Sequence, residues 1–178
     1  MQESPNPGVK WGFIAGAVLI LLNVATWKAG PQVLFSFWNS ISQLVLLIIF
    51  AVLAGRERKK QVGKYIGFKT VIRPVYTTFV LSMLMVTVYQ FVLYKYIDPS
   101  LSAALKADTL VSTERTMRYL KAPQDIIDQQ LEGIKAADFS VSIAKSFLDY
   151  LKVLIFYFGI AAIVSLFLRK KAPEQQHS

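Results

Sequence analysis

Four long uncharged stretches constrain this chain more than any other feature of its sequence. Residues 31–55 alone are twenty-five consecutive residues without a charge, and 54% of the whole chain is hydrophobic while 17% is charged. A helix of about 20 apolar residues crosses the hydrocarbon core of a bilayer, and soluble domains carry nearer 25% charge. The sequence therefore predicts an all-α membrane protein, a bundle of four transmembrane helices in a single domain. We expect the spans at about residues 10–28, 31–55, 74–95 and 148–168.

A basic stretch at residues 56–73 predicts the orientation of the bundle. It holds seven Lys or Arg residues and one acid, Glu57, and it joins the second and third predicted spans. Positively charged loops remain on the cytoplasmic side of the membrane. We therefore expect this loop and both termini to be cytoplasmic. Its cations, with those that follow the last span, are expected to contact anionic head groups: Arg56, Arg58, Lys59, Lys60, Arg169, Lys170 and Lys171.

The second half of the basic stretch permits two interpretations. Residues 62–72 could form a turn of helix in the head-group layer. The apolar and aromatic residues of this segment are interleaved with cations: Tyr65, Ile66, Phe68 and Ile72 with Lys64, Lys69 and Arg73. A plain connection that runs directly into the third span is the alternative.

Residues 96–146 are predicted to form an outer helical loop. They hold six Lys or Arg and seven Asp or Glu, a balance unlike that of the basic loop. Asp98 before Pro99 is typical of a helix start, and Ala122–Pro123 interrupts the helical pattern. Ile127, Leu131 and Ile134 then repeat at helical spacing. We expect two amphipathic helices that pack as a hairpin against the bundle mouth, with disorder at residues 109–116 as the alternative.

Several classes of site are unsupported by the residues present. The chain has no cysteine, and His177, its one histidine, lies in a polar tail. We therefore predict no catalytic, cofactor-binding or metal-binding residue, and no enzyme activity. The net charge of +9 lies mainly beside apolar runs and accompanies no nucleic-acid-binding motif, so we expect no nucleic-acid partner.

A polar stripe occurs within the second predicted span. Ser36, Asn39, Ser40 and Gln43 have the spacing of one helix face. Polar groups in hydrocarbon need partners, so the stripe is expected to face other helices. One interpretation is packing, in which these residues form hydrogen bonds with groups such as Asn23 on a neighbouring span. The other is that they line a solute path. Packing is the favoured interpretation.

Two further patterns have structural interpretations. Lys145, Asp149 and Lys152 share a face near the outer end of the last span, where lysines reach the interface and aspartate can pair along the helix. Gly12 and Gly16 permit close helix packing, which we expect inside the bundle rather than between copies.

Several short motifs resemble an uncharacterised bacterial family of four-span membrane proteins, of the domain of unknown function 4199 type. They are a glycine-rich first span with Gly12 and Gly16, the sequence Gly67-Phe68-Lys69 before the third span, and Tyr96-Ile97-Asp98-Pro99 after it. A last span with Gly159 and Ser165 and a Lys-rich end completes the resemblance. It implies a four-span fold in the bacterial cytoplasmic (inner) membrane, and it implies no activity.

The functional hypotheses follow from this layout. The first is a non-enzymatic accessory, scaffold or interaction subunit that acts through its outer or basic loop, with a membrane-protein partner or a second copy of itself. The second is a small oligomeric channel or transporter, although four spans without internal repeats are poor material for a transporter.

Overall fold

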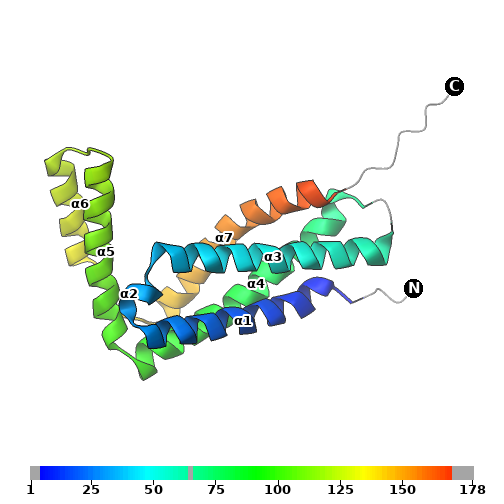
Figure 1. Ribbon diagram of the computed structural model, residues 1–178, viewed down its shortest axis with the longest axis horizontal. Helices are drawn as coiled ribbons and strands as arrows, with labels where there is room; N and C mark the ends of the chain where they lie inside the picture. Colours follow the sequence, from blue (N-terminus) through cyan, green and yellow to red (C-terminus); the bar gives the residue numbers. More distant parts are fainter. Residues whose placement is uncertain (1–4, 64–65, 170–178) are drawn as a thin grey trace.

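The computed structural model describes residues 5–63 and 66–169, which in these ranges form helices and no strands (Figure 1). Four helices are long and apolar enough to span a membrane: α1 (Pro7–Ala29), α3 (Phe37–Val62), α4 with its π-helical extension η1 (Phe68–Val92 and Leu93–Ile97), and α7 (Ile143–Leu168). Short α2 (Pro31–Leu34) precedes α3, and α5 (Ser100–Tyr119) and α6 (Gln124–Ala136) lie between η1 and α7. The chain is an all-α, multi-pass membrane protein, as predicted.

Helix α4 is the centre of the bundle and packs against α1, α3 and α7. Its Val71, Val75 and Phe79 are fully buried, and the ring of Phe79 stacks on Tyr157 of α7. The core that they join also takes in Ala15, Leu19, Leu47, Ala51, Val86 and Ala161. Helices α1, α3 and α7 each leave one side of large apolar residues exposed, as expected where lipid is the solvent.

Three glycines of α1 bring it against α4. A Cβ atom at Gly8 would overlap the backbone of Pro74, and those at Gly12 and Gly16 would meet Leu81 and Met85. The expectation that Gly12 and Gly16 serve packing inside the bundle is confirmed. Gly8 extends their pattern by one more turn.

Helix α1 also begins earlier than predicted. Asn6 caps it by accepting a hydrogen bond from the backbone N–H of Gly8, and its side-chain amide donates to Thr77 of α4 at 3.1 Å. The first span therefore starts at Pro7 rather than near residue 10, with residues 1–4 outside the described part of the chain.

The second predicted span is two helices rather than one. Helix α2 ends at Leu34, and α3 begins at Phe37 after Ser36, whose hydroxyl accepts a hydrogen bond from Trp38 N–H. Such an N-cap satisfies a backbone donor that the start of a helix leaves free. A run of uncharged residues does not reveal such a break.

The basic stretch is largely helical, which corrects the expectation of a loop at residues 56–73. Helix α3 continues to Val62, and α4 begins at Phe68, so the connection covers residues 63–67. Ile66 is buried in the core, and residues 64 and 65 lie outside the described part. Residues 68–72 belong to α4, so the interpretation of residues 62–72 as a separate head-group helix is wrong.

The α5–α6 hairpin projects from the other end of the bundle, across the direction of α1 and α3 (Figure 1). Its helices confirm the predicted pair, and residues 109–116 lie within α5. Ile127 is buried, and Leu131 and Ile134 are half-buried, on one face of α6. The hairpin does not cover the bundle mouth as expected, because α5 contacts the bundle near α2 and η1 while α6 packs mainly on α5. We call this hairpin the arm, and the two ends of the bundle the arm end and the basic end.

Candidate functional site

The polar residues of α1 and α3 meet near the arm end. Asn23 Nδ2 donates a hydrogen bond to Gln43 Oε1 at 3.1 Å and a second to the carbonyl oxygen of Leu19 in its own helix at 2.8 Å. Asn39 Nδ2 donates to the carbonyl oxygen of Leu34 at 2.7 Å and so ties α3 to α2. Two members of the predicted stripe therefore have packing roles. Ser36 does not share their face, because it is the N-cap of α3.

The rest of this polar surface lines a pocket of about 370 Å³. Gln90 and Asp108 come to it from α4 and α5, and Tyr157 comes from α7. The remaining lining residues are Asn23, Leu34, Phe35, Ser40, Gln43, Leu44, Tyr94 and Leu105. Its walls offer amide and hydroxyl groups with one carboxylate, which suits water or a small polar solute more than an apolar ligand.

The floor of the pocket is apolar. Leu19, Leu47 and Val86 are almost completely buried and belong to one core cluster. Each lies four residues, about one helical turn, from a pocket residue of its own helix: Asn23, Gln43 and Gln90 respectively. On these three helices the surface becomes apolar within one turn, although Tyr157 of α7, whose ring stacks on Phe79, lines the pocket from deeper in the core. The hydrogen bonds of Asn39 and Gln43 fit the packing interpretation of the stripe better than a solute path through one copy.

Two hydrogen bonds of Asp98 fix the base of the arm. Its carboxylate accepts from Trp27 Nε1 of α1 at 3.0 Å and from the Ser100 hydroxyl at the start of α5. The bond from Ser100, and then that from Trp27, hold the pKa of Asp98 below its usual value. Beside them Leu101 is buried against Leu34 and Leu93. The predicted helix start at Asp98 is close to the observed one, but its bond across to α1 is not visible in the sequence.

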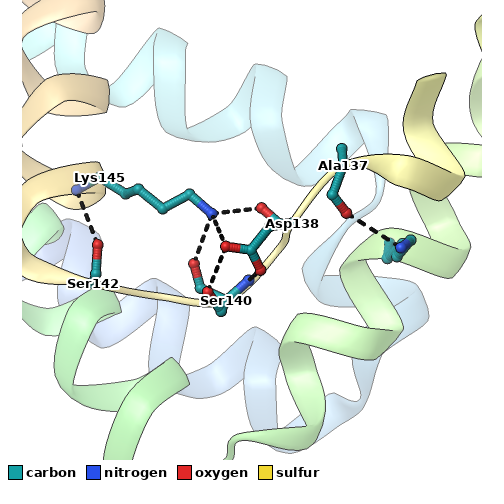
Figure 2. Close-up of polar contacts among 6 residues, drawn as sticks. Ala137, Asp138, Ser140, Ser142 and Lys145 are labelled. Atoms are coloured by element: carbon teal, nitrogen blue, oxygen red, sulfur yellow. Dashed lines mark hydrogen bonds and ion pairs between the residues drawn. The ribbon is translucent and has the colours of Figure 1, made fainter.

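The connection from α6 back to α7 is held by two lysines (Figure 2). Lys145 Nζ of α7 is 2.9 Å from Asp138 Oδ2 and also donates to the carbonyl oxygen of Ser140. Lys106 Nζ of α5 donates to the carbonyl oxygens of Lys135 and Ala137. The arm is thus fixed at both of its ends.

Asp138 is the most strongly engaged carboxylate of this connection. The hydroxyl and backbone N–H of Ser140 donate to it at 2.7 and 2.8 Å, and Lys145 adds its charge. These donors, the Ser140 hydroxyl first, hold the pKa of Asp138 far below its usual value. Lys145 therefore pairs with Asp138, whereas Lys152 pairs with Asp149 at 2.9 Å along α7. The structural interpretation of these three α7 residues is supported.

The two helices of the arm carry opposite charges. Residues 111–121 hold Arg115, Arg118 and Lys121 against one acid. Residues 124–136 hold Asp125, Asp128 and Glu132 against one lysine. The three acids are exposed, and their spacing places them on the face of α6 that points away from buried Ile127.

At the basic end, the first and second spans are joined by Glu57. Its carboxylate accepts from Trp11 Nε1 at 2.7 Å and from Lys10 Nζ at 3.0 Å. Leu168, the last residue of α7, approaches Gly55 of α3, so the two helices meet at this end. The predicted head-group cations Arg56, Arg58, Lys59, Lys60 and Arg169 therefore share one end of the bundle, and Lys170 and Lys171 lie outside the described residues.

Comparison with known families adds one finding. A family model described as a protein of unknown function (DUF4199) matches residues 10–170. No curated protein and no solved structure matches the chain. Within the described ranges, no three His, Cys, Asp or Glu side chains form a group that could hold a metal ion.

Proposed function

This chain belongs to the DUF4199 family, and from that premise we propose that it is a non-enzymatic interaction subunit that binds a partner protein through the arm. The observation that carries the proposal is the projection of the arm away from the bundle, with α6 packed mainly on α5 (Figure 1). A hairpin that only closed the bundle mouth would bury both of its helices against the spans. This hairpin leaves a whole face of α6 open.

The chemistry of that face suggests the type of partner. Asp125, Asp128 and Glu132 form an exposed acidic surface with Gln129 among them. A partner with a basic surface would be attracted to it, and its approach would slow as salt rises. The bonds of Asp98 and Asp138 hold the arm in one orientation, which reduces the entropy lost on binding.

The proposal includes an orientation and a membrane. The basic end and both termini face the cytoplasm, and the arm lies outside it, because cations concentrate at the basic end. We propose the bacterial cytoplasmic membrane because the motifs described in the sequence analysis resemble those of a bacterial family of four-span proteins, and that resemblance implies this membrane.

The orientation is testable in a chain that has no cysteine of its own. Gln61→Cys near the end of α3 and Ala107→Cys in α5 are introduced singly and treated with an impermeant thiol reagent from outside intact cells. We expect labelling at position 107 and none at position 61 until the membrane is permeabilised. The reverse pattern would place the arm in the cytoplasm.

The partner is tested with a photo-crosslinking residue at Gln129 on the outward face of α6, and at exposed Ile155 of α7 as the matched control. We expect position 129 to give one discrete adduct with another protein, identified by mass spectrometry, and position 155 to lack it. The double variant Asp125→Lys with Glu132→Lys should abolish the adduct. Adducts with copies of the same chain alone would instead support an oligomer.

The polar pocket favours one alternative, a channel formed by several copies. Ser40 is exposed and lines the pocket with Gln43, so an adjoining copy could extend the polar surface. The apolar floor beneath it weighs against conduction through a single copy.

A further inference from the structure

We propose that the arm lies flat on the head-group layer of the bilayer that the bundle spans, and that one stripe of α5 contacts lipid. The stripe consists of Ser112, Arg115 and Tyr119. This inference goes beyond the proposed function, because a partner would use the α6 face while lipid would meet the opposite side of the arm.

The direction of α5 is the first step. The spans α1 and α3 set the direction of the membrane normal, and α5 and α6 run across it and extend past α2 and α3 (Figure 1). A helix that leaves a membrane bundle crosswise at its end runs parallel to the membrane surface. Phe37 and Trp38, which are 70% and 77% exposed where α3 begins, lie at the same end. Exposed aromatic side chains of this kind are typical of the interface.

The face of α5 that looks toward the bilayer follows from its contacts with the bundle. Leu101 is buried against the bundle, and Leu105 and Asp108 line the pocket together with residues of the spans. Because side chains three, four and seven residues apart share a helix face, these three define one stripe. The same spacing continues to Ser112, Arg115 and Tyr119, beyond the edge of the bundle. The continuation must face the side on which the bundle, and therefore the bilayer, lies.

Helix α6 occupies the opposite side of α5. Lys106 donates to carbonyl oxygens at the end of α6 and just beyond it, and half-buried Leu110 and Met117 continue from Lys106 at helical spacing. Helix α5 is therefore the layer next to the bilayer, and α6 is the layer next to water.

The side chains of the stripe suit a lipid surface. Tyr119 is 86% exposed, and Val111, next to Ser112 in the chain, is 56% exposed. No described hydrogen bond or ion pair engages the Arg115 guanidinium. A free guanidinium binds phosphate oxygens, and tyrosine is favoured at the level of the head groups. The stripe thus presents the cation Arg115 to the lipid phosphates, while the acidic residues of α6 face water, an arrangement that charge complementarity favours.

The test compares two positions of the arm in the full chain. Ser112→Cys on the stripe and Gln129→Cys on the outward face of α6 are both exposed helical sites, and each is labelled with a fluorophore. The protein is placed in phosphatidylcholine nanodiscs that contain a lipid with a nitroxide quencher on its head group. We expect quenching several-fold stronger at position 112 than at position 129.

A charge reversal shows whether Arg115 carries the contact. Arg115→Glu should reduce the quenching at position 112, most strongly in discs with phosphatidylglycerol, and Glu132→Gln on the outward face should leave it unchanged. Equal quenching at positions 112 and 129 would overturn the proposal, because the arm would then stand free of the bilayer. So would protection of position 112 from both the lipid quencher and a water-soluble one, since a protein would then cover the stripe. Either result leaves the α6 crosslinking experiment able to succeed.

Discussion

At the scale of single residues, the close contact between α1 and α4 depends on the glycines of α1. A glycine has no Cβ, so two membrane helices can approach until their backbones touch. Gly8 uses this freedom most fully, because the atoms around its missing Cβ are the carbonyl oxygen and Cα of Pro74, which belong to the backbone. At Gly16 the nearest atom is the sulfur of Met85, near the end of a flexible side chain that can move, whereas at Gly12 it is the Cβ of Leu81, which is fixed to the backbone of α4.

We therefore predict that Gly8→Ala destabilises the bundle more than Gly16→Ala does. Backbone cannot give way without moving a helix, so the loss at position 8 should be about 1–3 kcal/mol, the usual cost of overpacking. Thermal unfolding in nanodiscs measures it. Gly159→Ala is the matched control, because nothing lies within 4 Å of its missing Cβ, and it should be neutral or slightly stabilising. Equal losses at positions 8 and 159 would contradict the close contact.

Residue roles were predictable where the spacing of residues within one helix places them on a common face. The spacing of Gly12 and Gly16 predicted a packing face, but Gly8 lies before the first predicted span, which was expected to begin at about residue 10. The bonds from Trp27 to Asp98 and from Trp11 to Glu57 join residues 71 and 46 positions apart. A single sequence gives no signal for such pairs, so the charged anchors at both ends of α1 could not be found from it.

At the scale of helices, the apolar runs predicted all four spans, with four of the eight ends within three residues, and missed the other ends by five to seven residues where the helix and the apolar run differ. Helix α3 continues to Val62 because Arg, Lys, Glu and Gln are good helix formers and can remain in water. Hydropathy marks where a segment leaves the hydrocarbon, and it does not mark where the helix ends. Helical spacing likewise predicted the two helices of the arm, but it carries no information about the direction in which they leave the bundle. That direction is fixed by the bond between Asp98 and Trp27, which lies outside the arm.

The connection between α6 and α7 should loosen in acid. The pKa of Asp138 is depressed in the folded protein, so its stabilising contribution is complete above the pKa of an unfolded aspartate, about 3.9. The contribution is then lost as the pH falls toward the lower folded value. Carbon-detected NMR of the Asp138 carboxyl measures that pKa directly. Ser140→Ala removes the leading hydrogen-bond donor and should raise it, and Lys145→Gln should raise it less. An Asp138 that titrates at its ordinary pKa would show that the connection seen in Figure 2 is open in solution.

At the scale of the whole molecule, polar and apolar layers alternate along the bundle. Cations lie at the basic end, an apolar core around Phe79 fills the middle, and the amide groups of Asn23 and Gln43 lie near the arm end. The arm adds a further layer that runs crosswise (Figure 1). This order explains why the polar stripe in the sequence looked compatible with a solute path. Ser40 and Gln43 of the stripe do lie together at the pocket, but the buried core of the bundle lies beyond them.

The layering predicts that one copy of the protein does not conduct, and that Asn39 and Gln43 serve packing. Replacing both with leucine removes the bonds to Leu34 and from Asn23, and interhelical hydrogen bonds in membranes average about 0.6 kcal/mol, so the double variant should lose about 1 kcal/mol of stability. Wild type and the double variant are reconstituted in liposomes, and the flux of ions and small solutes is measured beside the melting temperature. We expect no flux above that of empty liposomes for either protein, with a lower melting temperature for the variant. A polar path would behave differently, because leucine would block or dewet it while the fold remained intact. If wild type conducts and the variant loses that flux at an unchanged melting temperature, the pocket is one end of a path that several copies complete.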